Sequence, residues 1–175
     1  MQVCYIDEAG CPGTLPSSTS PVQPVLVVGA VIIPHANLAK VTLDFIQLKR
    51  RRFPGLLPMN AHHLDWVLPE IKGADLRSTV RGSSRRQKRH TLGFLGKCLD
   101  IVEQNDGKVV ARVWVKRPAV HFRGRAVYTS SIQIISRYFH HQLDAMGTDG
   151  LLVLDSRTSR QNAQVSHSIF TQKFK

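Results

Sequence analysis

Residues 25–33 read VLVVGAVII, the longest apolar run in the chain, and Pro34 ends it. An apolar run of this length is typical of a β-strand buried on both faces, although periodicity alone also allows a buried helix. Working outward from it, we expect further strands at residues 3–7 (VCYID), 109–115 (VVARVWV) and 151–155 (LLVLD). Two of these strands end in an aspartate.

Apolar residues at helical spacing separate the expected strands. They predict three helices: one between Asn37 and Pro54, one beginning at Ser83 or Ser84, and one over residues 127–146 that ends at Gly147. We expect loops or short elements over residues 53–82. Gly93 and Gly96 fall inside the second helix and suggest close packing of that helix against a neighbour.

The alternation of strands and helices indicates a three-layer α/β domain. A helix between two strands of one sheet is typical of a right-handed crossover, so residues 109–115 and 151–155 should be parallel. The length of 175 residues suits a single domain over residues 1–175.

The charge of the chain favours a polyanionic partner. There are 24 Lys and Arg against 12 Asp and Glu, a net charge of +12, and the sequence pI is about 10.3. The basic residues cluster at 49–52, 81–90 and 116–125. Each cluster alone is typical of a solvated face, but three together favour contact with the phosphates of nucleic acid. An acidic protein or a membrane surface would also fit the charge.

Several protein classes are disfavoured. No apolar run approaches the roughly 20 residues of a transmembrane helix, so we expect no membrane-spanning segment. Met1 leads directly into the first strand and leaves no room for a signal peptide. Three cysteines without a CxxC motif argue against a secreted disulfide scaffold and favour a reducing cytoplasm.

Acidic residues mark the expected site. Ligands of open α/β sheets bind at the carboxyl ends of the strands, where Asp7 and Asp155 lie. Glu70, in the irregular stretch PEIKG at residues 69–73, is a third candidate. One such aspartate is often only a helix cap or turn former. Converging carboxylates repel one another and are stabilised by a hard cation such as Mg²⁺.

These residues also carry a family resemblance. The hexapeptide YIDEAG at residues 5–10 resembles the YIDESG opening of the DUF3800 family, and the resemblance continues through residues 27–33, 70–73 and 151–155. It implies a ribonuclease H-like fold with a mixed sheet and flanking helices, and a metal-dependent nuclease. Members often occur near mobile elements and anti-phage loci, which implies a role in defence against mobile elements.

The resemblance implies a site for Mg²⁺ or Mn²⁺ and for DNA or RNA, which the sequence does not distinguish. The expected metal ligands are Asp7, Glu8, Glu70 and Asp155, and the expected catalytic residues are Asp7, Glu70, Asp155 and Lys72. The expected nucleic-acid contacts are Lys72, Arg81, Arg85, Arg86, Lys88 and Arg89. The alternative is a catalytically inactive nucleic-acid-binding or protein-interaction module on the same fold.

The end of the chain departs from the family pattern. Family members continue past the third acid to another strand and a closing helix that bears an aspartate, whereas only 20 residues without an acid follow Asp155 here. We therefore expect the C-terminal closing element to be missing, and Ile169, Phe170 and Phe174 to pack poorly. The uncovered sheet edge would then favour a homodimer.

Overall fold

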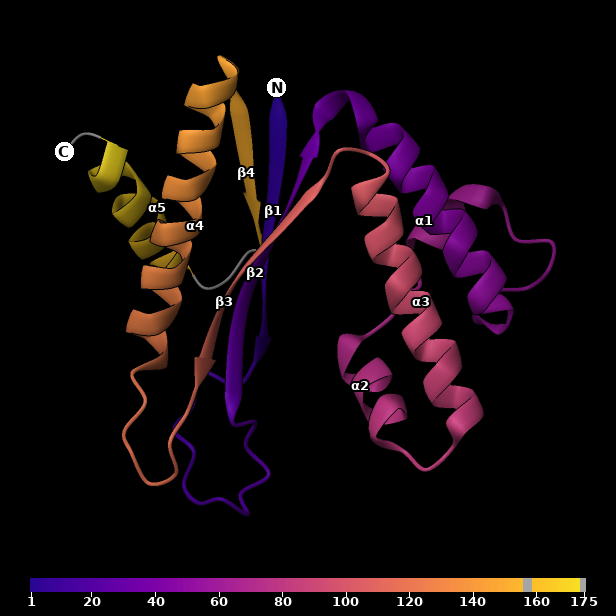
Figure 1. Ribbon diagram of the computed structural model, residues 1–175, viewed down its shortest axis with the longest axis horizontal. Coiled ribbons are helices and arrows are strands. Elements are labelled where there is room, and N and C mark those ends of the chain that lie inside the picture. Colours follow the sequence, from indigo (N-terminus) through magenta and orange to yellow (C-terminus); the bar gives the residue numbers. More distant parts are fainter. Residues whose placement is uncertain (156–158, 174–175) are drawn as a thin grey trace. The chain divides into compact units, whose positions relative to one another are not determined.

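The computed structural model describes residues 1–155 and 159–173, which form an α/β protein with a mixed four-stranded sheet and flanking helices (Figure 1). The strands are β1 (Gln2–Gly10), β2 (Val25–Pro34), β3 (Lys108–Val115) and β4 (Gly150–Leu154). The α-helices are α1 (Leu38–Arg52), α2 (Gly73–Arg81), α3 (Arg85–Glu103), α4 (Gly124–Met146) and α5 (Ser159–Lys173). Short 3₁₀ helices are η1 (His35–Asn37), η2 (Pro54–Leu56) and η3 (His63–Val67).

The chain forms two compact units. The sheet unit comprises Met1–His35 and Lys108–Lys175, and the helical unit comprises Ala36–Gly107. Among the described residues, no helix has both the length and the apolar character required to cross a membrane.

The sheet has the strand order β3-β2-β1-β4. Strand β2 is antiparallel to both β1 and β3, whereas β4 is parallel to β1. It follows that β3 and β4 run in the same direction, as the crossover argument predicts. The two strands nevertheless lie at opposite edges of the sheet, because β2 and β1 separate them.

One face of the sheet packs against helices of the same unit. The core consists of alternate strand residues and of one stripe of α4: Cys4, Ile6, Val28, Ala30, Ile32, Ile132, Ile135 and Phe139. Gly147 ends α4 with a positive φ of 58°, as predicted. The second face carries exposed valines such as Val109 and Val113. A third layer over that face stays a prediction.

Helix α5 was not predicted from the sequence. It lies beside α4 (Figure 1), and its Val165 and Ile169 pack against the core. The prediction that Ile169 packs poorly is therefore wrong, whereas Phe170 is 64% exposed. Phe174 lies outside the described residues. In the described part of the chain no strand follows β4.

The helical unit confirms two predicted helix boundaries. Helix α1 ends at Arg52, before Pro54, and the hydroxyl of Ser84 caps α3 by accepting a hydrogen bond from the backbone N–H of Gln87. Asn37 occupies the N-cap position of α1 without capping it, because its side chain instead donates a hydrogen bond to the carbonyl of Asn105 at 3.0 Å.

The glycines of α3 behave differently from one another. A Cβ at Gly93 would lie 3.7 Å from the guanidinium of Arg52, an ordinary packing distance. A Cβ at Gly96 would meet no atom within 4 Å. The prediction of close packing is therefore wrong at Gly96.

Candidate functional site

Asp7 and Asp155 lie at the same level of two adjacent strands. The parallel register of β1 and β4 pairs Ile6 with Leu154, so the next residue in each segment, Asp7 within β1 and Asp155 just after β4, is one of the two acids. Both acids are exposed and both line a shallow hollow of about 590 Å³ on the sheet. The prediction that the first strand ends at Asp7 is wrong, because β1 continues to Gly10. The parallel register of β1 and β4 nevertheless brings Asp7 level with Asp155.

The backbone orients the carboxylate of Asp7. Its Oδ1 atom accepts a hydrogen bond from the backbone N–H of Glu8 at 2.7 Å. Successive side chains of a strand point to opposite faces. Glu8 accordingly also lines a second cavity, of about 270 Å³, together with Arg125 and Tyr128 of α4.

Tyr128 is a site residue that sequence reasoning missed. Burial raises the pKa of its phenol above the usual value, and the negative charges of Asp7 and Asp155 raise it further. Both acids therefore lie within electrostatic reach of Tyr128. The helical spacing of Tyr128 indicated only a core position. The feature that could have identified it as a site residue is its hydroxyl group on an otherwise apolar stripe, in the first turns of α4.

The other two predicted catalytic residues belong to the helical unit. Glu70 and Lys72 lie between η3 and α2, where Lys72 occupies the N-cap position of α2. They line a separate pocket of about 640 Å³. Their participation in one site with Asp7 and Asp155 stays a prediction. Within the described residues, no group of three or more His, Cys, Asp or Glu side chains is arranged to hold a metal ion.

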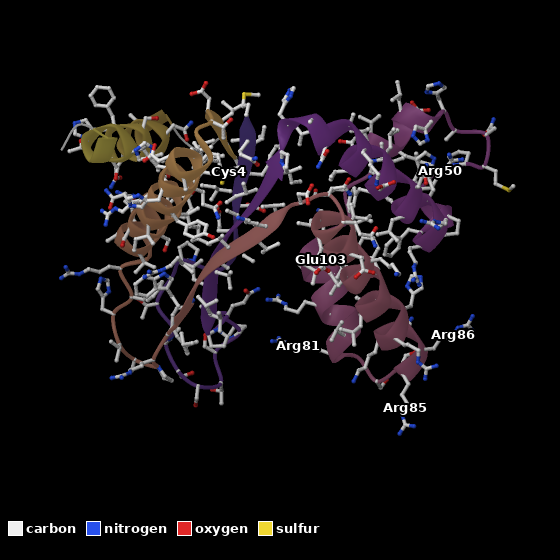
Figure 2. The ribbon with its side chains drawn as sticks, turned by 45° about the horizontal axis from the view of Figure 1, so that its top comes forward. Cys4, Arg50, Arg81, Arg85, Arg86 and Glu103 are labelled. Atoms are coloured by element: carbon white, nitrogen blue, oxygen red, sulfur yellow. The ribbon has the colours of Figure 1, made fainter. Side chains whose placement is uncertain are left out.

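The predicted nucleic-acid contacts gather on one helical hairpin. Arg81 is the last residue of α2, and Arg85, Arg86, Lys88 and Arg89 occupy the first turns of α3. Figure 2 shows the side chains of Arg85 and Arg86 extending outward from the start of α3. Among the described residues, none of these five cations forms an ion pair with an acid.

The other two basic clusters are used partly inside the protein. Lys49 is buried and donates a short hydrogen bond to the carbonyl of Trp66, and its burial lowers the pKa of the ammonium group. The guanidinium of Arg50 lies over the Trp66 ring, 5.9 Å from its centroid. Lys116 is buried too and donates hydrogen bonds to the carbonyls of Cys11 and Gly13. These lysines stabilise the fold, so their charges do not contribute to a solvated basic surface.

The chain as a whole matches no protein-family model, no curated protein and no solved structure. Its class is therefore defined by its own architecture: an α/β protein in which the adjacent parallel strands β1 and β4 bring Asp7, within β1, level with Asp155, just after β4.

Proposed function

We propose that this protein is a divalent-metal-dependent nuclease of the ribonuclease H-like, DUF3800 type, which hydrolyses phosphodiester bonds in DNA or RNA. The observation that carries the proposal is the pairing of Asp7 with Asp155 at matching levels of β1 and β4. The family resemblance supports the fold type and a role in defence against mobile elements.

The residues fit a magnesium or manganese ion. Mg²⁺ is usually bound through one or two carboxylates, with waters and substrate phosphates completing its shell. Asp7 and Asp155 supply two carboxylates beside an open hollow, and Glu8, which also borders it, is the proposed additional ligand. A bound ion would supply a Lewis acid and an acidified water for hydrolysis.

The chain's own groups orient the reactants. The backbone N–H of Glu8 holds the Asp7 carboxylate in place, so less reorientation is needed on binding. The raised pKa of Tyr128 keeps its phenol protonated at neutral pH. A protonated phenol can donate a hydrogen bond to a phosphate oxygen near the two acids. Lys72 is proposed to hold a substrate phosphate.

Nucleic acid would bind mainly through its phosphates. The unpaired cations Arg81, Arg85, Arg86 and Arg89, together with Lys88, present a basic surface on the α2–α3 hairpin. Binding through phosphates is sensitive to salt and largely independent of base sequence. A homodimer through an edge of the sheet is part of the same proposal.

The alternative is an inactive nucleic-acid-binding or protein-interaction module. One observation favours it: the cations of the α2–α3 hairpin form no ion pair with a described acid, and they could bind phosphates without a metal ion. In that case the cations would bind nucleic acid that is not cleaved, or they would bind an acidic protein.

Cleavage of labelled single- and double-stranded DNA and RNA separates these functions. We expect the protein to cleave nucleic acid in the presence of Mg²⁺ or Mn²⁺, and EDTA to abolish the cleavage. The variants Asp7→Asn and Asp155→Asn should still bind nucleic acid but should not cleave it. The matched control is Asp149→Asn. Asp149 is an exposed acid just before β4, and its backbone carbonyl, not its side chain, accepts a hydrogen bond from the backbone N–H of Gln2. Full activity of Asp7→Asn would refute the proposal, and binding without cleavage under every metal would favour the alternative.

A further inference from the structure

The sheet unit contains a cavity of about 250 Å³ that is lined by residues of α4, β4 and α5. Four apolar side chains form much of its wall: Phe139 and Leu143 of α4, Leu152 of β4 and Ile169 of α5. An apolar protein cavity of about 150 Å³ is already large enough to bind benzene. This cavity therefore has room for a molecule with one aromatic ring.

Gly150 allows the apolar wall to pack closely against β4. A Cβ atom at this position would lie 2.5 Å from Cζ of Phe139 and 2.6 Å from Cδ1 of Leu143. Gly150 does not have a positive φ, so its backbone conformation does not require glycine. A glycine in a strand often marks a place where another group approaches the backbone closely. Close packing against β4 thus fixes two of the side chains that line the cavity.

A buried hydroxyl in the same cavity lacks a partner. Ser136 of α4 lines the cavity and is only 7% exposed, and its Oγ atom makes no hydrogen bond to any described residue. Thr129 and Ser131 of the same helix each donate a hydrogen bond to the carbonyl four residues earlier, which is a common way to satisfy a helical hydroxyl. An unpaired buried hydroxyl costs free energy. A bound molecule would remove this cost.

A water molecule is a poor partner for this hydroxyl. A buried water usually makes about three hydrogen bonds, and the four apolar side chains of the wall offer none. A mostly apolar molecule with one hydroxyl group suits the cavity better, because its ring contacts the wall while its hydroxyl bonds to Ser136. Rotation of Ser136 about its Cα–Cβ bond, between staggered positions, is enough to direct Oγ toward such a molecule.

We infer that this cavity binds a small phenol-like molecule, with one apolar ring and a single hydroxyl group that bonds to Ser136. The exposed residues Arg137 and His140 also line the cavity, so it opens to solvent on their side. No residue of this cavity lines the hollow that holds Asp7 and Asp155. The inference therefore does not depend on the proposed nuclease activity.

The test compares two compounds that differ only by a hydroxyl in place of a methyl group, p-cresol and p-xylene. Isothermal titration calorimetry of the full chain, without nucleic acid or metal, measures their Kd values. We expect p-cresol to bind, and Ser136→Ala to weaken this binding about two- to tenfold, the effect of losing one hydrogen bond. Binding of p-xylene should be equal or tighter in the variant. No saturable binding of p-cresol, or equal p-cresol affinity in wild type and Ser136→Ala, overturns the inference.

A matched control and a stability measurement isolate the role of Ser136. Ser130→Ala changes a serine of the same helix outside the cavity, so its p-cresol affinity should equal that of the wild type. Ser136→Ala removes an unpaired buried hydroxyl, so its urea unfolding midpoint should be no lower than that of the wild type. An equal loss of p-cresol affinity in both variants, or a clear loss of stability in Ser136→Ala, overturns the inference.

A second variant locates the bound compound. Ile169→Phe places a larger side chain in the wall and should weaken binding of both p-cresol and p-xylene. Unchanged affinity for both compounds in a folded Ile169→Phe protein would place their site elsewhere and overturn the inference. If this variant does not fold, the comparison of Ser136→Ala with Ser130→Ala still decides.

Discussion

Asp7 directly follows Ile6 on β1, and Asp155 directly follows Leu154 on β4, so the parallel pairing of Ile6 with Leu154 brings the two acids to one level. The strands connect through more than 130 residues of intervening chain. The two acids therefore come together only when the sheet is formed. The pKa of the nearby Tyr128 responds to the charges of both acids.

Removing either acid should lower the pKa of Tyr128. A nearby negative charge disfavours the phenolate and so raises the pKa, and Asp7→Asn or Asp155→Asn removes one such charge. The pKa should remain above the usual value for tyrosine, because burial is the larger cause. Phenolate absorbance during alkaline titration, compared with a Tyr128→Phe background, measures the shift. No shift in either variant would separate Tyr128 from the proposed site.

Replacing Arg85, Arg86, Lys88 and Arg89 together by Ala should weaken nucleic-acid binding and flatten its salt dependence. Each lost phosphate contact reduces the log–log salt slope by about 0.7–0.9. Lys40→Ala and Lys97→Ala serve as controls, because these lysines already pair with Asp44 and Asp100 on their own helices. A slope that remains unchanged in the fourfold variant would identify the hairpin as an ordinary solvated face.

Lys116→Met should destabilise the protein. The ammonium group of Lys116 donates hydrogen bonds to the carbonyls of Cys11 and Gly13, at 2.8 and 3.0 Å, and so anchors the loop after β1 to the end of β3. Losing these bonds should lower the free energy of unfolding by about 1–3 kcal/mol. Urea unfolding measures the loss, with the exposed Lys108→Met as control. Equal stabilities of the two variants would contradict a structural role for Lys116.

Two glycine substitutions should act in opposite directions. Gly96→Ala should raise the free energy of unfolding by up to about 1 kcal/mol, because alanine favours the helix and the added Cβ meets no atom within 4 Å. Gly124→Ala should lower it, because a Cβ there would lie 1.9 Å from the carbonyl oxygen of Pro12. Thermal unfolding compares them; a destabilised Gly96→Ala would indicate a neighbour at that position.

The elements with strong local patterns could be predicted from the sequence. The apolar run at residues 25–33 specified β2, and the spacing of apolar residues specified α1, α3 and α4 to within a few residues. Ser84 and Gly147 marked helix ends because each acts through its own chemistry. The Ser84 hydroxyl accepts a capping hydrogen bond, and Gly147 adopts a positive φ without steric cost. Helix α5 was missed because its apolar residues are few, and only packing against α4 gives them a buried face.

Features that depend on residues far apart in the chain could not be predicted and follow from the packing of the folded protein. Strand order placed β3 and β4 at opposite edges, and register set Asp7 beside Asp155. Lys49 and Lys116 are buried because each donates hydrogen bonds to backbone carbonyls of a distant segment. No local pattern in the sequence shows which carbonyls need such a partner, so these two lysines could not be distinguished from the exposed basic residues. Periodicity describes how one segment divides between core and solvent, whereas pairing and electrostatic contact depend on which distant segments meet.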